Sequence, residues 1–170
     1  MLYTSTRDNS VKVSAAHAIA QGISEEGGLF VPCEFPHFSV DKIKEMASMC
    51  YIDRAKTVLR EFLDDFSEEE LDYCVSGAYA AGKFSSDAVA PTVNIHGNEN
   101  VLELWHGPTC AFKDMALQLL PYLMTVSAKK TADGKTIVIL VATSGDTGKA
   151  ALEGFKDVDH TKILVFYPEN

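Results

Sequence analysis

The chain has 170 residues, of which 46% are hydrophobic and 23% are charged. This composition is ordinary for a globular protein and excludes a disordered or fibrous chain. The 15 basic and 24 acidic side chains leave a formal net charge of −9. Because binding to nucleic acids and anionic membranes depends on basic clusters, we expect neither kind of partner.

The cysteines indicate a reducing compartment. Cys33, Cys50, Cys74 and Cys110 are widely spaced and form no C-x-x-C pair, so they predict neither a disulfide framework nor a zinc knuckle. The N-terminal segment has no apolar signal core, and no apolar run approaches the roughly 20 residues of a membrane span. We therefore expect a soluble cytoplasmic protein.

The first part of the chain is predicted to be mostly helical with short strands. Strands are expected at residues 2–5 and 29–31, and a helix near 14–21 with Ser14 as its N-cap. Three stretches with apolar residues at i, i+3, i+4 and i+7 then predict amphipathic helices, at residues 43–50, 55–62 and 71–78. Ser67 and Glu70 form a capping-box pattern, which predicts that the third of these helices begins there.

From residue 101 the pattern alternates between strand and helix. Strands are expected at 101–105, 137–142 and 163–167, and helices at 112–123 and 148–155. The unbroken apolar run at 137–142 is typical of a parallel strand that is covered on both faces. Pro121 should kink or shorten the helix that contains it. We predict an α/β fold in which a helical domain, residues 1–90, precedes the incomplete start of a parallel βαβαβ sheet domain, residues 91–170.

Two loops carry the candidate chemistry, because ligands of open parallel sheets bind beyond the carboxyl ends of the strands. In the loop at 106–114, Lys113 opens a helix, whose positive end disfavours an ammonium and favours the neutral amine that Schiff-base chemistry needs. A solvated lysine at a helix start is the alternative. In the loop at 143–148, two glycines and several hydroxyls allow backbone N–H groups to approach an anion, or form only a tight turn.

Nucleotide and metal sites are not indicated. Gly148-Lys149 lacks both the glycine five residues earlier and the hydroxyl residue after the lysine that a Walker loop requires. The sequence has no G-x-G-x-x-G, H-E-x-x-H or G-x-S-x-G motif, and its 5 histidines show no ligand spacing. We therefore expect no metal site.

The two loops resemble the active-site motifs of the threonine synthase family. The matching residues are His106-Gly107-Pro108-Thr109, Ala111-Phe112-Lys113-Asp114 with Gln118, and the run Ala142-Thr143-Ser144-Gly145-Asp146-Thr147-Gly148. The N-terminal segments 3–7 and 21–32 are also similar, so the resemblance covers the whole chain. It implies a fold of the tryptophan-synthase-β type (pyridoxal phosphate fold type II). It also implies an enzyme that uses pyridoxal 5′-phosphate (PLP) to convert O-phospho-L-homoserine and water to L-threonine and phosphate.

The resemblance also implies roles for single residues. Lys113 would form the Schiff base with PLP and then move protons between substrate carbons, and Asp146 would face the 3′-oxygen of the cofactor. Cofactor contacts are implied for Lys113, Phe112, Ser144, Gly145, Asp146 and Thr147, and substrate contacts for Thr109, Ser144 and Thr147.

Members of that family are longer than this chain, and their cofactor-phosphate loop and the residue facing the pyridine nitrogen lie further along. We therefore expect an N-terminal part of a threonine synthase that is inactive alone and binds PLP weakly. The alternative is a stand-alone, catalytically dead homologue that acts as an interaction domain. In either case an incomplete sheet edge would favour self-association.

Overall fold

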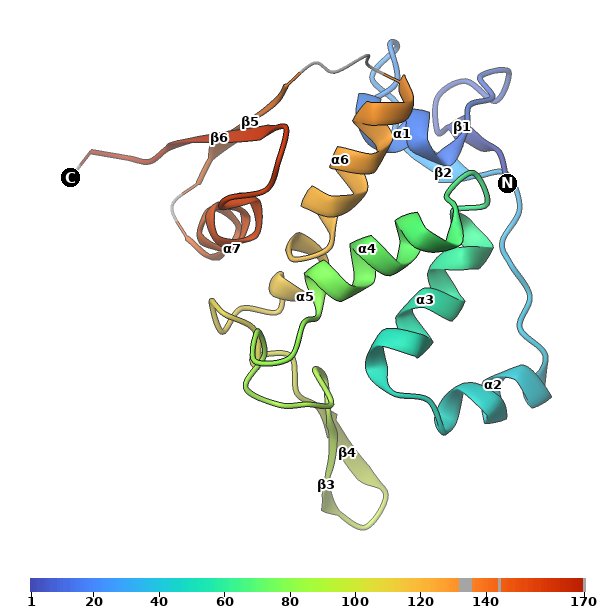
Figure 1. Cartoon of the computed structure of the whole chain (residues 1–170), viewed down its shortest axis with the longest axis vertical. Helices are drawn as coiled ribbons and strands as arrows, with labels where there is room; N and C mark the ends of the chain where they lie inside the picture. The colour runs from blue at the N-terminus through green and yellow to red at the C-terminus, as the bar shows by residue number, and fades with distance from the viewer. Residues whose placement is uncertain (132–135, 144, 170) are drawn as a thin grey trace. The chain divides into compact units, whose positions relative to one another are not determined.

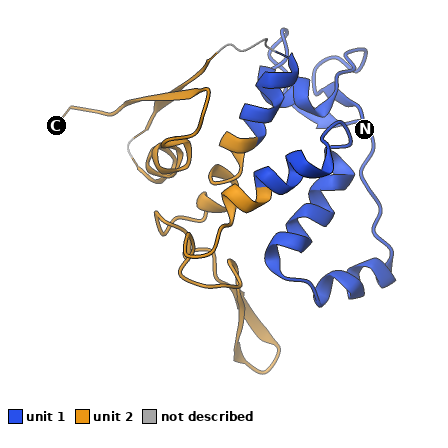
Figure 2. Cartoon of the chain, in the orientation of Figure 1, with its two compact units in different colours: residues 1–74, 123–135 blue, residues 75–122, 136–170 orange. Residues whose placement is uncertain are grey.

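The computed structural model describes residues 1–131, 136–143 and 145–169, so Ser144, one of the predicted site residues, lies outside the described residues. The chain divides into two compact units (Figure 2), unit 1 with residues 1–74 and 123–135 and unit 2 with residues 75–122 and 136–170. No helix in the described ranges has the length and apolar character needed to cross a membrane.

Unit 1 begins with a two-stranded antiparallel sheet, in which β1 (Tyr3–Ser5) pairs with β2 (Phe30–Pro32). Helix α1 (Ala15–Gln21) lies between them in the chain. The hydroxyl of Ser14 accepts a hydrogen bond from the His17 N–H at 3.3 Å, which confirms the predicted N-cap. The expected order of strand, helix and strand is therefore confirmed.

Three helices follow, α2 (Val40–Ala47), α3 (Tyr51–Phe62) and α4 (Glu68–Ala78) (Figure 1). The capping box before α4 is confirmed in both directions. The Ser67 N–H donates to the Glu70 carboxylate at 2.7 Å, and the Glu70 N–H donates to the Ser67 hydroxyl at 3.2 Å. The predicted apolar stripe of α4 is completely buried, with Leu71, Cys74, Val75 and Ala78 each 0% exposed.

The strand predicted at 101–105 belongs to a hairpin in unit 2. β3 (Thr92–His96) pairs antiparallel with β4 (Glu99–Leu102), and Gly97 between them has a φ of +53°. The side-chain amide of Asn94 donates to the carbonyls of Gly97 and Glu99 and so stabilises the turn. The expected βαβαβ order is therefore wrong in its first strand, because β4 pairs with β3 in one two-stranded sheet while β5 and β6 form another. The short turn between β3 and β4 can join only antiparallel strands.

The two later strands are parallel, as predicted. β5 (Ile137–Ala142) pairs in register with β6 (Thr161–Phe166), and α7 (Asp146–Phe155) connects them and packs on them (Figure 1). Because side chains alternate across a strand, every second residue of β5 and β6 lies on the face opposite to α7. The large apolar residues on that face are 52–67% exposed, namely Val138, Leu140, Leu164 and Phe166.

The single helix predicted at 112–123 is divided into α5 (Asp114–Leu117) and α6 (Leu120–Thr131). The break precedes Pro121, which lies in the first turn of α6, where a missing N–H costs little. The predicted shortening is thus confirmed. α7 packs closely on α5, since a Cβ at Gly154 would lie 2.0 Å from the carbonyl oxygen of Leu117.

The thiol of Cys74 is expected to be inert in the native protein. Burial raises the pKa of this thiol to about 12, and the negative charge of Glu70 adds to the shift. Because the thiolate is the reactive form, a disulfide reagent at neutral pH should modify the exposed cysteines 33, 50 and 110 and leave Cys74 unmodified. Denaturant should return its pKa to the ordinary value and release a fourth reactive thiol. Equal rates for all four in the native protein would contradict this expectation.

Candidate active site

A buried carboxylate holds the first loop, residues 106–114. Asp114 is 0% exposed, and its carboxylate accepts hydrogen bonds from the N–H and the hydroxyl of Thr109, both at 2.8 Å. A Cβ at Gly107 would lie 2.4 Å from the Asp114 side chain, so only glycine allows the loop to fold over that carboxylate. These contacts fix the backbone from which Lys113 extends.

The loop brings Lys113 and Phe112 together. The Lys113 amine lies 4.6 Å from the centroid of the Phe112 ring, and the lysine is half-buried next to this exposed ring. Lys113 is the N-cap residue of α5, which has only 4 residues, so the helix-dipole argument made from the sequence has little force here. The amine is accessible to a small electrophile and is flanked on one side by an aromatic face.

The second loop depends on one of its two glycines for its shape. A Cβ at Gly145 would have no heavy atom of the described residues within 4 Å, whereas a Cβ at Gly148 would lie 1.7 Å from Thr143 Cγ2. The Thr143 hydroxyl accepts a hydrogen bond from the Gly145 N–H at 3.2 Å. Asp146 and Thr147 then begin α7 as exposed side chains. The loop thus lies against the strand end and presents polar groups to solvent.

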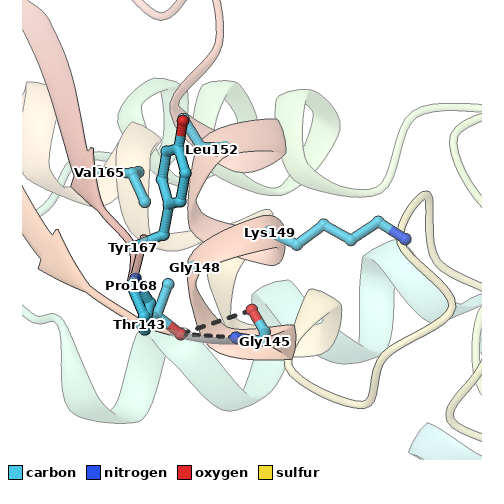
Figure 3. Close-up of a pocket in the computed structure, with 8 residues that line it drawn as sticks. All are labelled: Thr143, Gly145, Gly148, Lys149, Leu152, Val165, Tyr167 and Pro168. Carbon is cyan, nitrogen blue, oxygen red and sulfur yellow. Dashed lines mark hydrogen bonds between the residues drawn. The ribbon is translucent and has the colours of Figure 1, made fainter. Parts of the chain in front are cut away.

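A cavity of about 390 Å³ adjoins this loop (Figure 3). It is lined by Thr143, Gly145, Gly148, Lys149, Leu152, Val165, Tyr167 and Pro168. The cavity lies at the carboxyl ends of β5 and β6, the position where open parallel sheets bind ligands. Of the predicted site residues that the structure describes, its lining includes only Gly145.

Lys149 connects the two loops. Its side chain extends away from the other lining residues (Figure 3), and its amine donates to the carbonyl oxygen of Thr109 at 3.4 Å. The first loop is therefore in contact with the helix that follows the second loop. Both loops belong to unit 2, so one compact unit contains Lys113, Asp146 and Thr147.

Two polar features of unit 2 were not predicted. Gln118 is 0% exposed, and neither its amide oxygen nor its amide nitrogen has a hydrogen-bond partner among the described residues. His106 lies between two partners, Glu103 at 2.7 Å and Ser85 at 2.8 Å. The spacing of three residues could have suggested the pair of Glu103 and His106. It could not have suggested Ser85, which lies 21 residues before His106 in the chain and is brought close to it by the intervening turns. Over the ranges that the structure describes, no three His, Cys, Asp or Glu side chains gather as at a metal site.

Comparisons with known proteins all find threonine synthases or threonine-synthase-like proteins. The family model described as "Threonine synthase N terminus" matches residues 2–79. A threonine synthase of Pseudomonas aeruginosa is 40% identical to this chain. The match covers 100% of this chain and 36% of the length of that protein. "Threonine synthase-like 1" of Pongo abelii is 37% identical, over 96% of this chain and 23% of that protein.

A solved structure gives the same result. The PLP-bound threonine synthase from Brucella melitensis superposes with a TM-score of 0.91 at 39% identity, covering 99% of this chain and 36% of that chain. The chain therefore spans between 23% and 36% of the length of these relatives.

Removal of the Asp114 carboxylate should destabilise the fold. Asp114→Ala would leave the N–H and the hydroxyl of Thr109 buried without acceptors, at a cost of about 3 kcal/mol in the free energy of unfolding. Asp114→Asn keeps one acceptor oxygen and should lose about half as much. Urea denaturation measures both differences. The interpretation fails if Asp114→Ala is as stable as the unchanged chain.

Proposed function

This chain belongs to the threonine synthase family, whose N-terminal portion it matches, and on that premise we propose that it supplies the lysine-bearing part of a PLP-dependent enzyme. The proposed parent reaction converts O-phospho-L-homoserine and water to L-threonine and phosphate, a carbon–oxygen lyase step of threonine biosynthesis. The observation that carries this proposal is the half-buried amine of Lys113 beside Phe112. We place the activity in the cytoplasm, because all four cysteines are free.

The residues present fit PLP at its aldehyde and at one edge of its ring. Lys113 offers a primary amine, and Asp146 and Thr147 offer exposed polar side chains. The open space at Gly145 leaves room for a flat group. Lys113 would hold the cofactor, Asp146 would face its ring hydroxyl, and Phe112 would lie beside the amine. When bound, PLP supplies an electron-withdrawing ring that stabilises negative charge on a substrate carbon.

Lys113 is suited to the proton transfers that this reaction needs. Loss of phosphate from the γ-carbon and addition of water at the β-carbon require several protons to move, and a flexible amine can take each from one carbon and give it to another. Contacts with the substrate are proposed for Ser144, Thr147 and Thr109. Since the Thr109 hydroxyl is bonded to Asp114, Thr109 would act by fixing the loop.

We further propose that this chain alone is inactive and binds PLP weakly, because it spans only 36% of the Pseudomonas relative and the proposed cofactor contacts are confined to two loops. A second candidate is a catalytically dead interaction domain. The exposed apolar face of β5 and β6 favours it, since parallel sheets are ordinarily covered on both faces.

Labelling with PLP tests the first proposal. The chain is incubated with PLP and reduced with borohydride, and the labelled peptides are identified by mass spectrometry. We expect Lys113 to be labelled at lower PLP concentration than the exposed Lys12. Labelling of Lys113 should saturate only far above micromolar PLP. Lys113→Arg should remove this label, and Lys12→Arg should leave it. Equal labelling of both lysines would contradict the site. A stable stoichiometric complex at micromolar PLP would contradict weak binding.

Sedimentation tests self-association. We expect the mass of the native chain to increase with concentration. The double variant Leu140→Lys with Leu164→Lys should weaken association by about tenfold or more, since each buried leucine contributes ~1.5–3 kcal/mol. Lys156→Gln, at the exposed end of α7 away from this face, is the matched control. A chain that stays monomeric at every concentration would refute this proposal.

A further inference from the structure

A line of hydrogen bonds separate from Lys113 joins Ser85, His106 and Glu103. The hydroxyl of Ser85 lies 2.8 Å from His106 Nδ1, and His106 Nε2 lies 2.7 Å from Glu103 Oε2. The backbone holds the same pair, because the Ser85 N–H donates to the His106 carbonyl at 2.8 Å. A hydroxyl, an imidazole and a carboxylate in this order resemble a catalytic triad, which recurs on unrelated folds. The ring nitrogens are exchanged here, because Nδ1 faces the hydroxyl and Nε2 faces the carboxylate.

The hydrogen-bond partners of a neutral His106 determine its tautomer, that is, which ring nitrogen carries the proton. A carboxylate can only accept a hydrogen bond, so Nε2 carries the imidazole proton toward Glu103 and Nδ1 is left as an acceptor. Nδ1 therefore accepts the hydroxyl proton of Ser85, as a general base must. The side chains of His106 and Glu103 are only 17% and 21% exposed. The contact between these two side chains is thus partly shielded from water.

The serine is accessible and has backbone donors next to it. Ser85 is exposed, and the turn that follows is closed by the Val89 N–H to the carbonyl of Ser86. The N–H groups of Ser86 and Asp87 have no acceptor within the described ranges of the chain. The N–H that follows a nucleophilic serine commonly stabilises the oxyanion of acyl transfer.

Trp105 provides a surface for a flat or short substrate. Its ring stacks on His106 with centroids 5.8 Å apart and an interplanar angle of 30°, and the tryptophan is 51% exposed. An aryl or short acyl group can lie on this ring next to the serine. The chemical class that these features suit is the ester of a short carboxylic acid.

We propose that Ser85, His106 and Glu103 form a second, hydrolytic site for such esters. The Ser85 oxygen attacks the carbonyl carbon while its proton passes to His106 Nδ1. The ester C–O bond then breaks, the alcohol leaves with that proton, and the acyl group stays on Ser85. A water molecule then gives a proton to His106 Nδ1 and attacks the acyl carbon. The bond between this carbon and the Ser85 oxygen breaks, that oxygen takes the proton back from His106, and the acid leaves. Glu103 acts as a positioning residue that also stabilises the charged imidazole.

Hydrolysis of p-nitrophenyl acetate by the full chain tests this site. Ser85→Ala should lower the protein-dependent rate by about 100-fold, the lower range of what general base catalysis supplies. Ser76→Ala, at an exposed serine of the same unit, should leave the rate unchanged. Glu103→Gln should slow the acetylation of Ser85, and Glu103→Asp should restore part of it.

The position of the acetyl group distinguishes this site from the lysines. We expect it on Ser85 as an ester that hydroxylamine removes, and in Ser85→Cys as a thioester at the same position. Labelling of Lys113 by PLP should be the same in Ser85→Ala, so this test is independent of the proposed synthase function. Unaltered hydrolysis by Ser85→Ala, or acetyl groups found only as hydroxylamine-stable amides on lysines, would overturn the proposal.

Discussion

The buried carboxylate of Asp114 determines the arrangement of the candidate active site. With no access to solvent, its oxygens depend on donors from the protein, and Thr109 supplies both its N–H and its hydroxyl. Gly107 makes this possible, because any side chain there would overlap with the carboxylate. Asp114 follows Lys113 directly, so the bonds that this neighbour makes fix the backbone from which the proposed reactive amine extends. In the proposed enzyme, such preorganisation of the loop would lower the entropic cost of bringing a substrate to the amine.

Helix α7 extends this constraint to the rest of the site. Its side chain Lys149 reaches the carbonyl of Thr109 in the first loop, and Gly154 allows its backbone to contact the end of α5. The same helix begins at the second loop with Asp146 and Thr147. One helix therefore begins in the second loop and contacts the first, and these two loops hold the residues that the family resemblance assigns to the cofactor.

Local patterns in the sequence predicted the elements whose stability is local. Strand β5 was predicted with its observed limits, because a continuous apolar run is bounded there by polar residues, and the capping box of Ser67 and Glu70 marked the start of α4. Strand β3 was missed because all five of its residues are exposed and it depends on pairing with β4. Lys113 and Phe112 are neighbours in the chain and were found together. The contacts of Thr109 with Asp114, and of Ser85 with His106, arise from turns whose geometry no residue spacing encodes.

The close approach of Gly148 to Thr143 has a consequence for how this loop can evolve. A Cβ at position 148 would lie 1.7 Å from the branched methyl of Thr143, so the two positions cannot drift independently. A larger residue at 148 requires a smaller side chain at 143 first, because the added Cβ would also lie 2.9 Å from the Thr143 Cβ. The order of the two changes therefore matters. The path by which descendants could alter this loop therefore passes through Thr143 first.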